Sequence, residues 1–341
     1  MRAVSMQSNT ARDLALIDVA VPDPAPHEVR IKVEAVGICG SDVSMAMAKP
    51  NFDFVERPRI FGHEFAGTID AVGSRVGDWH AGDPVSCLSI LGCLQCDDCL
   101  SGNTSRCARR RILGFHMSGA MADWVAVDAR YILPLRGLSP VAGALLEPLA
   151  VACRCVHGAC DIAAGYGSVV ISGCGIIGLL CALIARACGA QVSITGLPLD
   201  VDVRLKKAQE LGFTTIVISE ETGSLLDQLP GPVDLLIEAS GAPPALAEAG
   251  QVVVTGGLIG VVATYADSVA LPATELVRAE QRLHMSFGAS RHDFDQAINH
   301  IEKGDIPVDE LVDTYSLEEA LIAFDDSIAK TTQKAVLIPS H

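Results

Sequence analysis

Hydrophobic and polar residues follow different patterns in the two halves of the chain. In the first half, short runs with alternating apolar residues, such as EVRIKVEAVG, FAGTIDAVG, DPVSCLSI and ADWVAVDARYILPL, are separated by Gly, Pro and Asp. Alternation with a period of two, interrupted by turn residues, is typical of short strands. The first half is therefore predicted to be a mainly β domain, with its strands forming a partly open barrel.

The second half alternates apolar strands with apolar helices. The stretch SVVISGCGIIGLLCALIARACGAQVSIT predicts a strand at 168–171, a turn, a helix at 179–188 and a strand at 191–195. Further strands are predicted at TTIVIS, at DLLIEASG and, after a turn at TGG, at LIGVVATY. Strands that alternate with helices favour an α/β domain with a doubly wound parallel sheet, here from about 158 to 288. Amphipathic helices at 293–306 and 317–330 lie outside this pattern.

Three glycines separate the first of these strands from its helix. Gly173, Gly175 and Gly178 form G-x-G-x-x-G, which is weak alone but typical of dinucleotide binding between a strand and a helix. The first glycine makes the turn, the second lets the backbone approach a pyrophosphate, and the third lets the helix pack on the strand. The helix N-terminus then receives the pyrophosphate. We expect these glycines and the neighbouring Ile177 to bind the cofactor.

Length and charge limit the possible partners. A chain of 341 residues favours two domains. The 41 acidic and 25 basic residues give a net charge of −16, which disfavours a nucleic-acid partner; the local RCARRR run is interpreted as a solvated loop. The longest apolar stretch contains glycines and Arg186, and fits a strand–turn–helix unit better than a membrane span. With no secretory signal visible, we expect a cytoplasmic protein that binds neither nucleic acid nor membrane.

The 12 cysteines fall into groups with different surroundings. In a reducing compartment, disulfides are poor candidates. Six cysteines lie among Ala, Val, Ile and Leu and are interpreted as buried packing residues: Cys153, Cys155, Cys160, Cys174, Cys181 and Cys188.

Four other cysteines lie among polar loop residues: Cys93, Cys96, Cys99 and Cys107. Their spacing, C-x2-C-x2-C-x7-C, suits the four thiolates of a closed tetrahedral zinc site, with packing and redox roles as the alternatives. Gly92 and Gly102 supply the turns. We therefore predict a structural zinc in a lobe at about 87–111.

A second group of possible metal ligands is spread over the first half. Cys39, His63, Glu64 and Glu147 supply a thiolate, an imidazole and carboxylates. Three protein ligands and an open position are typical of catalytic zinc. A loop histidine and a packing cysteine are the plainer interpretations of the first two residues. Cys153 and Cys155 are rival third ligands.

These motifs together resemble the zinc-dependent medium-chain alcohol/polyol dehydrogenases. The resemblance rests on GICGSD, GHEFAGTIDAVG, the four-cysteine lobe, EPLAV, GCGIIG and ASGAPPAL, which follow in order along essentially the whole chain. It implies a barrel-like (GroES-like) catalytic domain at 1–153, a Rossmann domain at 154–288 and a return to the catalytic domain at 289–341. It also implies a dimer or tetramer, for which the apolar strand LIGVVATY is a candidate pairing edge.

The resemblance also implies roles for single residues. Cys39 and His63 would bind the catalytic zinc, and Glu64 would be a ligand or exchange on and off the metal. Glu147 stands where simple-alcohol members carry Cys and polyol members Glu, which favours the sorbitol, galactitol and threonine dehydrogenase branch. The sequence leaves open which glutamate is the direct third ligand.

Other residues match positions of the family around the reacting groups. Ser41 matches the proton-relay position, and Asp42 would be a hydrogen-bond partner of the site. Ser44 stands where many members have His, which puts the usual relay in doubt. Arg291 matches a position near the nicotinamide and substrate hydroxyls, with a surface Arg as the alternative. Three phenylalanines are candidates for the pocket lining: Phe52, Phe54 and Phe115.

The implied activity is hydride transfer between a secondary alcohol and NAD or NADP, with two zinc ions per chain. The substrate would be a polyol, sugar, cyclitol or amino alcohol. Zinc would lower the pKa of the hydroxyl, and the alkoxide would expel hydride to the nicotinamide. The alternatives are a reductase of a small ketone or aldehyde, a simple alcohol dehydrogenase, and a non-catalytic zinc and nucleotide-binding protein.

The choice of nicotinamide depends on the end of the strand QVSIT. NAD-specific enzymes usually place Asp or Glu there, whereas this chain has Gly196. The missing carboxylate favours NADP or dual use, with Arg204 pairing with the 2′-phosphate. If Asp200 or Asp202 reached back to the ribose, NAD would be preferred instead.

Overall fold

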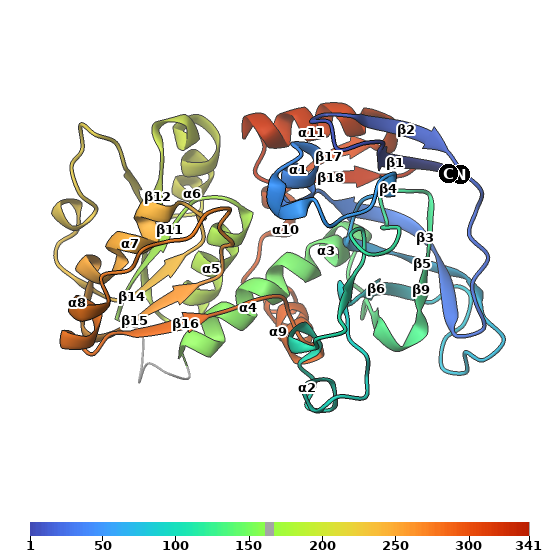
Figure 1. The fold of residues 1–341 in the computed structure, drawn as a ribbon, viewed down its shortest axis with the longest axis horizontal. Helices are drawn as coiled ribbons and strands as arrows, with labels where there is room; N and C mark the ends of the chain where they lie inside the picture. Colours follow the sequence, from blue (N-terminus) through green and yellow to red (C-terminus); the bar gives the residue numbers. More distant parts are fainter. Residues whose placement is uncertain (161–166, 341) are drawn as a thin grey trace. The chain divides into compact units, whose positions relative to one another are not determined.

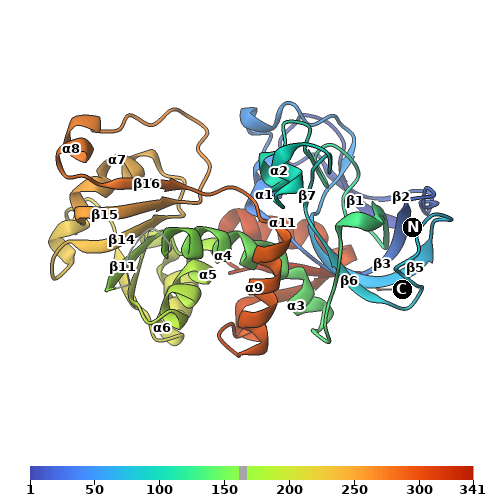
Figure 2. The same ribbon diagram turned by 90° about the horizontal axis from the view of Figure 1, so that it is seen from below.

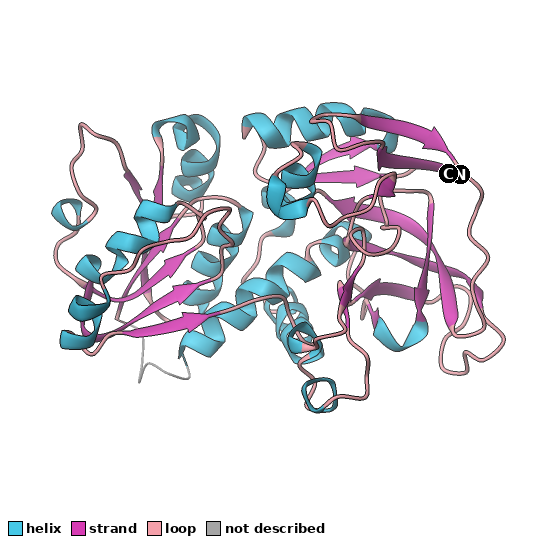
Figure 3. Ribbon diagram, in the orientation of Figure 1, coloured by secondary structure: helices cyan, strands magenta, loops and turns pink. Residues whose placement is uncertain are grey.

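The computed structural model describes residues 1–160 and 167–340, and the chain divides into two compact units (Figure 1). Unit 1 comprises Met1–Glu147, Ala289–Phe294 and Val308–His341, and unit 2 comprises Pro148–Gly288 and Asp295–Pro307. Figure 3 shows that strands predominate in unit 1, whereas unit 2 combines strands and helices. Within the described ranges, no helix is long and apolar enough to cross a membrane.

Unit 1 is built around strand β3, as the alternating pattern predicts. β3 (Glu28–Gly37) buries alternate residues and pairs antiparallel with β5, β9 and β18 in a sheet of order β10-β6-β5-β3-β18-β17. A three-stranded sheet, β2-β1-β4, and a two-stranded one, β7-β8, complete the unit. The strands of unit 1 are β1 Arg2–Met6, β2 Leu14–Asp18, β4 Arg59–Ile60, β5 Glu64–Val72, β6 Pro84–Cys87, β7 Ile90–Leu91, β8 Arg111–Ile112, β9 Trp124–Asp128, β10 Ile132–Pro134, β17 Asp313–Ser316 and β18 Ala335–Ile338.

Short helices connect these strands. α1 (Gly40–Ala46) follows β3 directly, so the end of the central strand and the start of α1 present adjacent side chains. The other helical segments of unit 1 are η1 Pro50–Phe52, α2 Asp97–Leu100, η2 Thr104–Arg106, η3 Ala129–Tyr131, α3 Pro140–Ala144, α10 Val308–Leu311, η7 Leu317–Glu319 and α11 Ala320–Ala329.

The last strand of the chain returns to the central strand of unit 1. β18 pairs antiparallel with β3, with Val336 opposite Gly37 and Leu337 opposite Val36. This pairing carries Lys334, just before β18, to the end of β3 where α1 begins. The C-terminal segment therefore contributes to the same site as residues near position 40.

Unit 2 contains the predicted parallel sheet. Its six strands have the order β13-β12-β11-β14-β15-β16, the Rossmann order in which the direction of winding reverses between β11 and β14. Ligands bind at this reversal, beyond the carboxyl ends of the strands. The strands are β11 Ser168–Ser172, β12 Gln191–Gly196, β13 Thr214–Val217, β14 Val233–Glu238, β15 Val253–Val261 and β16 Arg282–Met285.

Helices cover both faces of this sheet, with α5 and α6 on one side and α7 on the other (Figure 2). α5 (Ile176–Ala187) is apolar almost all round because it packs against β11, β12 and β14. The remaining helical segments that belong wholly or partly to unit 2 are α4 Leu146–Cys160, η4 Pro198–Asp200, η5 Val201–Leu205, α6 Lys206–Glu210, η6 Leu226–Gln228, α7 Pro243–Val252, α8 Ala273–Arg278 and α9 Arg291–Glu302.

Two details of the sequence prediction for the sheet are wrong. The TGG segment lies within β15 and not in a turn before it, and the register against β14 shifts there. β15 lies between β14 and β16, so LIGVVATY is not an edge for subunit pairing. The edge strands are β13 and β16, and the short and mixed sequence RLHM of β16 gives little strand signal.

The described cysteines among those interpreted as packing residues are buried, with one exception. Cys153, Cys155, Cys174 and Cys181 are buried, whereas Cys188 is exposed because it follows the last residue of α5. The side chain of Cys160 lies outside the described residues.

Candidate metal and cofactor sites

Three of the predicted ligands of catalytic zinc come together in unit 1. Cys39 caps the N-terminus of α1, and His63 and Glu64 lie at the start of β5, whose register places Glu64 opposite Gly37. The Cys39 Sγ, a ring nitrogen of His63 and a carboxylate oxygen of Glu64 all lie within 4.8 Å of one another. The pairing of β3 with β5 thus brings together residues that are more than twenty positions apart.

Asp42 holds this cluster from α1. It is fully buried, its Oδ2 accepts a hydrogen bond from the Cys39 N–H at 3.0 Å, and its Oδ1 lies 3.8 Å from His63 Nδ1. Burial lowers the pKa of His63, but the carboxylate of Asp42 and the thiol of Cys39 outweigh this and raise it well above its ordinary value. At 3.8 Å the contact with His63 is too long for a hydrogen bond, so Asp42 acts on the ring through its charge. The hydrogen bond from the Cys39 N–H agrees with the expectation that Asp42 is a hydrogen-bond partner of the site.

Sequence reasoning missed Lys334, which completes the cluster. Its Nζ donates hydrogen bonds to the Glu64 carboxylate and, at 2.8 Å, to the carbonyl oxygen of Ile38. Lys334 is 2% exposed and Glu64 is 1% exposed. Burial lowers the pKa of Lys334, but Glu64 and Cys39 raise it above its ordinary value, so the ammonium form persists. TTQKAVLIP carries no motif that marks this lysine, because its role depends on the pairing of β18 with β3.

Glu147 lies beside the cluster but outside the set of mutually close ligand atoms. It is buried in the first turn of α4, and its Oε1 accepts a hydrogen bond from Ser89 Oγ at 2.7 Å. Burial raises the pKa of Glu147 above its ordinary value, although the nearby His63 partly offsets this. The structure thus places a second carboxylate next to the three convergent donors. Which glutamate binds the metal directly stays a prediction.

This donor set fits a zinc ion. It offers a thiol, an imidazole and a carboxylate, which are the ligand types of catalytic zinc. Burial and the charge of Glu64 raise the pKa of the Cys39 thiol, although His63 and Lys334 partly offset this. His63 Nδ1 and Asp42 Oδ1 have no hydrogen-bond partner within the described chain. A divalent cation would compensate the crowded negative charge and fix the imidazole.

Two more predicted residues lie near the donors. The Ser41 hydroxyl is buried and makes no hydrogen bond to any described residue, so its proton-relay role stays a prediction. The Phe115 and His63 rings meet edge-on, with their centroids 5.4 Å apart, and the Phe115 ring also contacts those of Phe52 and Phe54. These aromatic rings form an apolar wall beside the cluster.

Arg291 is placed at the first residue of α9 in unit 1. Its Nη2 donates to the carbonyl oxygens of Arg130 and Ile132, each at 3.2 Å. The guanidinium therefore anchors the start of α9 to the segment between β9 and β10. A contact with nicotinamide or substrate stays a prediction.

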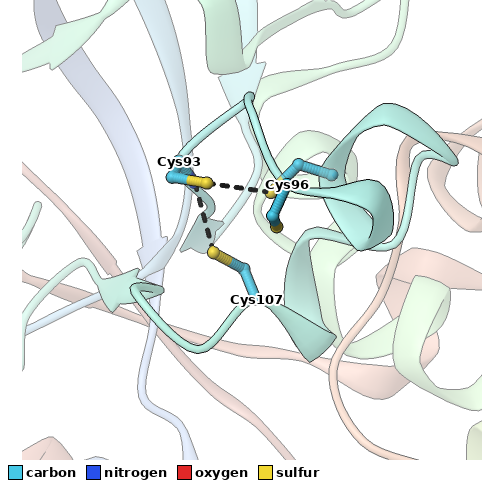
Figure 4. A group of neighbouring side chains, drawn as sticks. Cys93, Cys96 and Cys107 are labelled. Carbon is cyan, nitrogen blue, oxygen red and sulfur yellow. Dashed lines mark hydrogen bonds between the residues drawn. The ribbon is translucent and has the colours of Figure 1, made fainter.

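The four-cysteine lobe converges as its spacing predicts, and Figure 4 shows Cys93, Cys96 and Cys107 side by side. The sulfur atoms of Cys93, Cys96, Cys99 and Cys107 lie within 4.8 Å of one another, and those of Cys93 and Cys99 are 4.0 Å apart. Thiolates around a tetrahedral zinc, with Zn–S of about 2.3 Å, are separated by about 3.8 Å. The backbone N–H groups of Gln95 and Cys96 lower the pKa of Cys93 to about 6, which favours the thiolate. These residues fit a closed zinc site.

The buried pair of Lys334 and Glu64 leads to a stability prediction. Lys334→Met should lower the free energy of unfolding of the metal-free protein by about 3–5 kcal/mol, because Glu64 would stay buried without its cation. Chemical denaturation of the chelated protein measures the change. Lys49→Met removes an exposed lysine as a control. A second substitution, Glu64→Gln in the Lys334→Met variant, should recover most of the loss. If Lys334→Met were as stable as the control, the pair would not contribute.

The glycines of unit 2 occupy positions that explain their identity. Gly173 has φ +106° and directly follows β11, and a Cβ on Gly178 would lie 1.9 Å from the Gly173 carbonyl oxygen. Gly175 caps the N-terminus of α5, with open space where its side chain would be. The turn, the close helix packing and the open approach for a pyrophosphate are thus all present. Ile177 lies in the first turn of α5.

The end of β12 explains why Gly196 lacks a side chain. A Cβ there would lie 2.8 Å from Cys174 Sγ and 2.9 Å from Leu205 Cγ. Asp200 is buried, its Oδ2 accepts from the Leu197 N–H at 3.0 Å, and its Oδ1 lies 3.9 Å from Arg204 Nη1. Asp200 is therefore engaged with its own loop and with Arg204.

A further residue at the winding reversal was missed by sequence reasoning. Glu238, fully buried at the end of β14, accepts from the Ser240 N–H at 2.8 Å, the Gly241 N–H at 3.2 Å and the Tyr265 hydroxyl. A Cβ on Gly173 would lie 2.9 Å from Ser240 Cα. Glu238 thus fixes the loop that faces the glycine turn. The acidic residue in the strand DLLIEASG is the one sequence signal for it.

Comparison with known proteins gives matches along most of the chain. Residues 25–137 match the family model of the alcohol dehydrogenase GroES-like domain, and residues 177–303 match that of zinc-binding dehydrogenases. D-arabitol-phosphate dehydrogenase from Enterococcus avium is 31% identical over 100% of this chain and 98% of its own length. L-galactonate-5-dehydrogenase from Escherichia coli K12 is 30% identical over 85% of this chain and 84% of its own.

The fold also matches solved structures. A Sinorhizobium meliloti 1021 protein described as a zinc-binding dehydrogenase, bound to NADP, is 27% identical. It aligns with a TM-score of 0.87 over 99% of each chain. Both domain types expected from the motifs are therefore confirmed.

Proposed function

Because the chain belongs to the zinc-dependent medium-chain dehydrogenases, we propose that it transfers hydride between a secondary alcohol of a polyol or sugar derivative and NADP or NAD. The observation that carries this proposal is the buried convergence of Cys39, His63 and Glu64. A protein that only bound zinc and nucleotide would have no need of an aromatic wall and an unengaged hydroxyl beside such a cluster.

The substrate class follows from Glu147 and from the relatives. A buried carboxylate beside the cluster stands where simple-alcohol members carry a cysteine. The relatives in Enterococcus avium and Escherichia coli are named for arabitol phosphate and galactonate, which are polyhydroxylated molecules. Both features favour a polyol, sugar or sugar-acid substrate over a simple alcohol.

The residues of the chain would bind and orient the reacting groups. When bound, zinc supplies a Lewis acid that lowers the pKa of the substrate hydroxyl, and the nicotinamide accepts hydride from the carbon. Cys39, His63 and one of the two glutamates would hold the ion, while Asp42 would position Cys39 through the hydrogen bond from its N–H. Ser41 would relay the hydroxyl proton, accepting it at Oγ while passing its own proton on to solvent water, since its Oγ is not committed to any described residue. The Phe115 ring, which lies against His63, would exclude water from one side of the cluster.

The chain would accept NADP, with or without NAD. Gly196 leaves no carboxylate to oppose a 2′-phosphate, and Asp200 is turned toward Leu197 and Arg204. Arg204 lies in η5, immediately after the loop that follows β12. Its guanidinium would form charge-assisted hydrogen bonds to the phosphate.

Kinetic assays with both cofactors test the activity and the cofactor preference together. Absorbance of the reduced nicotinamide should rise when the zinc-loaded protein meets a panel of polyols, polyol phosphates, sugar acids, amino alcohols and simple alcohols. Arg204→Gln should lower kcat/KM for NADP by about 10- to 100-fold, because a charged hydrogen bond contributes about 1.5–3 kcal/mol, and should change kcat/KM for NAD little.

A matched variant controls for the loss of positive charge. Lys207 is bound to Glu210 at 3.0 Å, so Lys207→Gln should leave both cofactors unaffected. Equal losses with NADP and NAD in Arg204→Gln would contradict the 2′-phosphate contact. If the protein turned over none of the alcohols, and none of the corresponding carbonyl compounds in the reverse direction, the proposed dehydrogenase activity would be contradicted.

The subunits would associate through the β16 edge of unit 2. Leu283 and Met285 of β16 are 40% and 60% exposed, and Val277 of the preceding α8 is 75% exposed. An exposed strand edge with apolar side chains favours pairing with a second copy. Sedimentation of the full chain would measure the mass of the assembly and so distinguish a dimer from a tetramer.

The protein would reside in the cytoplasm, because the free thiols of both candidate zinc sites suit a reducing compartment.

A further inference from the structure

A third group of potential metal ligands lies in unit 2, separate from the residues assigned above. It consists of Cys153 and His157 on α4 and His300 near the end of α9. The Cys153 Sγ and one nitrogen of each ring lie within 4.8 Å of one another. Cys153 and His157 are four positions apart, so they share one face of α4. Cys153, a rival ligand for catalytic zinc by sequence, is thus grouped with two histidines and not with Cys39.

The hydrogen bonds of the two histidines direct one nitrogen of each ring toward the other. His157 Nδ1 lies 2.7 Å from Gln296 Oε1, and His300 Nδ1 lies 2.7 Å from Asp305 Oδ2. An amide oxygen and a carboxylate oxygen only accept hydrogen bonds, so the Nδ1 atom of each ring carries the proton. The two Nε2 atoms are 3.4 Å apart and face each other with their lone pairs when the rings are neutral.

The lone pairs of two neutral rings that face each other repel. A cation between the two Nε2 atoms removes this repulsion, and the spacing of these atoms suits a metal ion. Nitrogen ligands about 2.0–2.1 Å from a tetrahedral zinc are separated by about 3.3 Å. The observed separation is 3.4 Å. A thiolate and two imidazoles are ligands that zinc accepts readily. A proton shared between the rings is the other possible occupant, but it leaves the adjacent thiol outside the site.

The surroundings of the histidines resemble the outer partners of known metal sites. A ligand histidine typically donates its second N–H to a carboxylate or carbonyl oxygen, which fixes the ring and raises its basicity. Asp305 serves His300 in this way, and the Gln296 amide oxygen serves His157. Gln296 lies on α9 and Asp305 just beyond it, so both outer partners come from the segment that carries His300.

We propose that Cys153, His157 and His300 bind a zinc ion, with a fourth position open to water. The ion would cross-link α4 to α9 through histidines that are 143 positions apart in the sequence. Because the ion would bind only the folded arrangement, it would stabilise unit 2. The site shares no residue with the Cys39 cluster or the four-cysteine lobe, so it does not depend on the proposed reaction.

Metal analysis of the full chain tests this site. Protein purified from zinc-supplemented medium should contain three zinc ions per chain, and the double variant Cys153→Ala with His300→Gln should contain two. After exchange for cobalt, the difference spectrum between the two proteins should show a thiolate-to-cobalt charge-transfer band. Cys188→Ser with His80→Gln removes an exposed thiol and an exposed imidazole, and should keep three ions.

A milder variant keeps the test valid if the double variant fails to fold. Asp305→Asn retains all three ligands and should weaken zinc binding at this site by about 10- to 100-fold, as measured by competition with a chelator. Equal zinc content in the parent and the double variant, with no cobalt difference band, would overturn the proposal. Nitrogen NMR of the zinc-saturated parent that showed a proton shared between His157 and His300 would overturn it as well.

Discussion

Replacing His63 with alanine should reduce kcat by about 10³-fold or more while the protein stays folded. Metal polarisation of the substrate oxygen contributes several kcal/mol to the transition state, and about 4 kcal/mol corresponds to 10³ in rate. His63 supplies the imidazole of the Cys39, His63 and Glu64 cluster, so its loss should also weaken zinc binding there. Steady-state assays, metal analysis and circular dichroism follow turnover, zinc content and folding separately.

Two comparisons make the His63 result specific. His80→Ala removes a histidine whose side chain is 78% exposed in the same unit, and should leave turnover unchanged. Fluorescence titration with reduced cofactor should give the same dissociation constant for His63→Ala as for the parent, because unit 2 carries the glycine turn. If His63→Ala kept more than a tenth of the parental kcat with one zinc fewer, the assignment of the catalytic site would be wrong.

Residues adjacent in short motifs could be predicted from the sequence. The spacing of Cys93 to Cys107 predicted four convergent thiols because one short loop has few ways to arrange them. The alternation in EVRIKVEAVG predicted the bounds of β3, and the glycines after β11 predicted a turn that has room for a pyrophosphate. In each case local backbone geometry decides the outcome.

Residues that act through long-range pairing could not be predicted in the same way. Lys334 reaches Glu64 only because β18 pairs with β3, and nothing near position 334 signals that contact. His157 and His300 meet because α4 and α9 are adjacent, although the sequence predicted only an amphipathic helix at 293–306 and packing cysteines around His157. At position 196, the absence of a carboxylate from the sequence was related to the choice of cofactor. The structure adds a steric reason, because a side chain at this position would collide with Cys174 and Leu205.

The last prediction concerns the four-cysteine lobe, whose loss should affect stability far more than chemistry. Cys99→Ser should remove one zinc ion per chain and expose the lobe to proteolysis, because metal binding supplies most of the folding energy of such small lobes. Only Cys99 and Cys107 of the four are buried, and α2 spans just Asp97–Leu100, so few apolar contacts could hold the lobe without metal.

The contrast between stability and turnover tests the structural assignment. Limited proteolysis should cleave Cys99→Ser between about 92 and 111, and its inactivation temperature should fall, while the kcat of the surviving enzyme stays within about threefold of the parent. Cys87→Ser is a matched control, because Cys87 is a buried cysteine of β6 outside the lobe. Unchanged zinc content and thermal stability in Cys99→Ser would show that the four thiols do not hold a metal. A collapse of kcat with the lobe intact would instead place Cys99 in the chemistry, which a closed four-thiolate site does not allow.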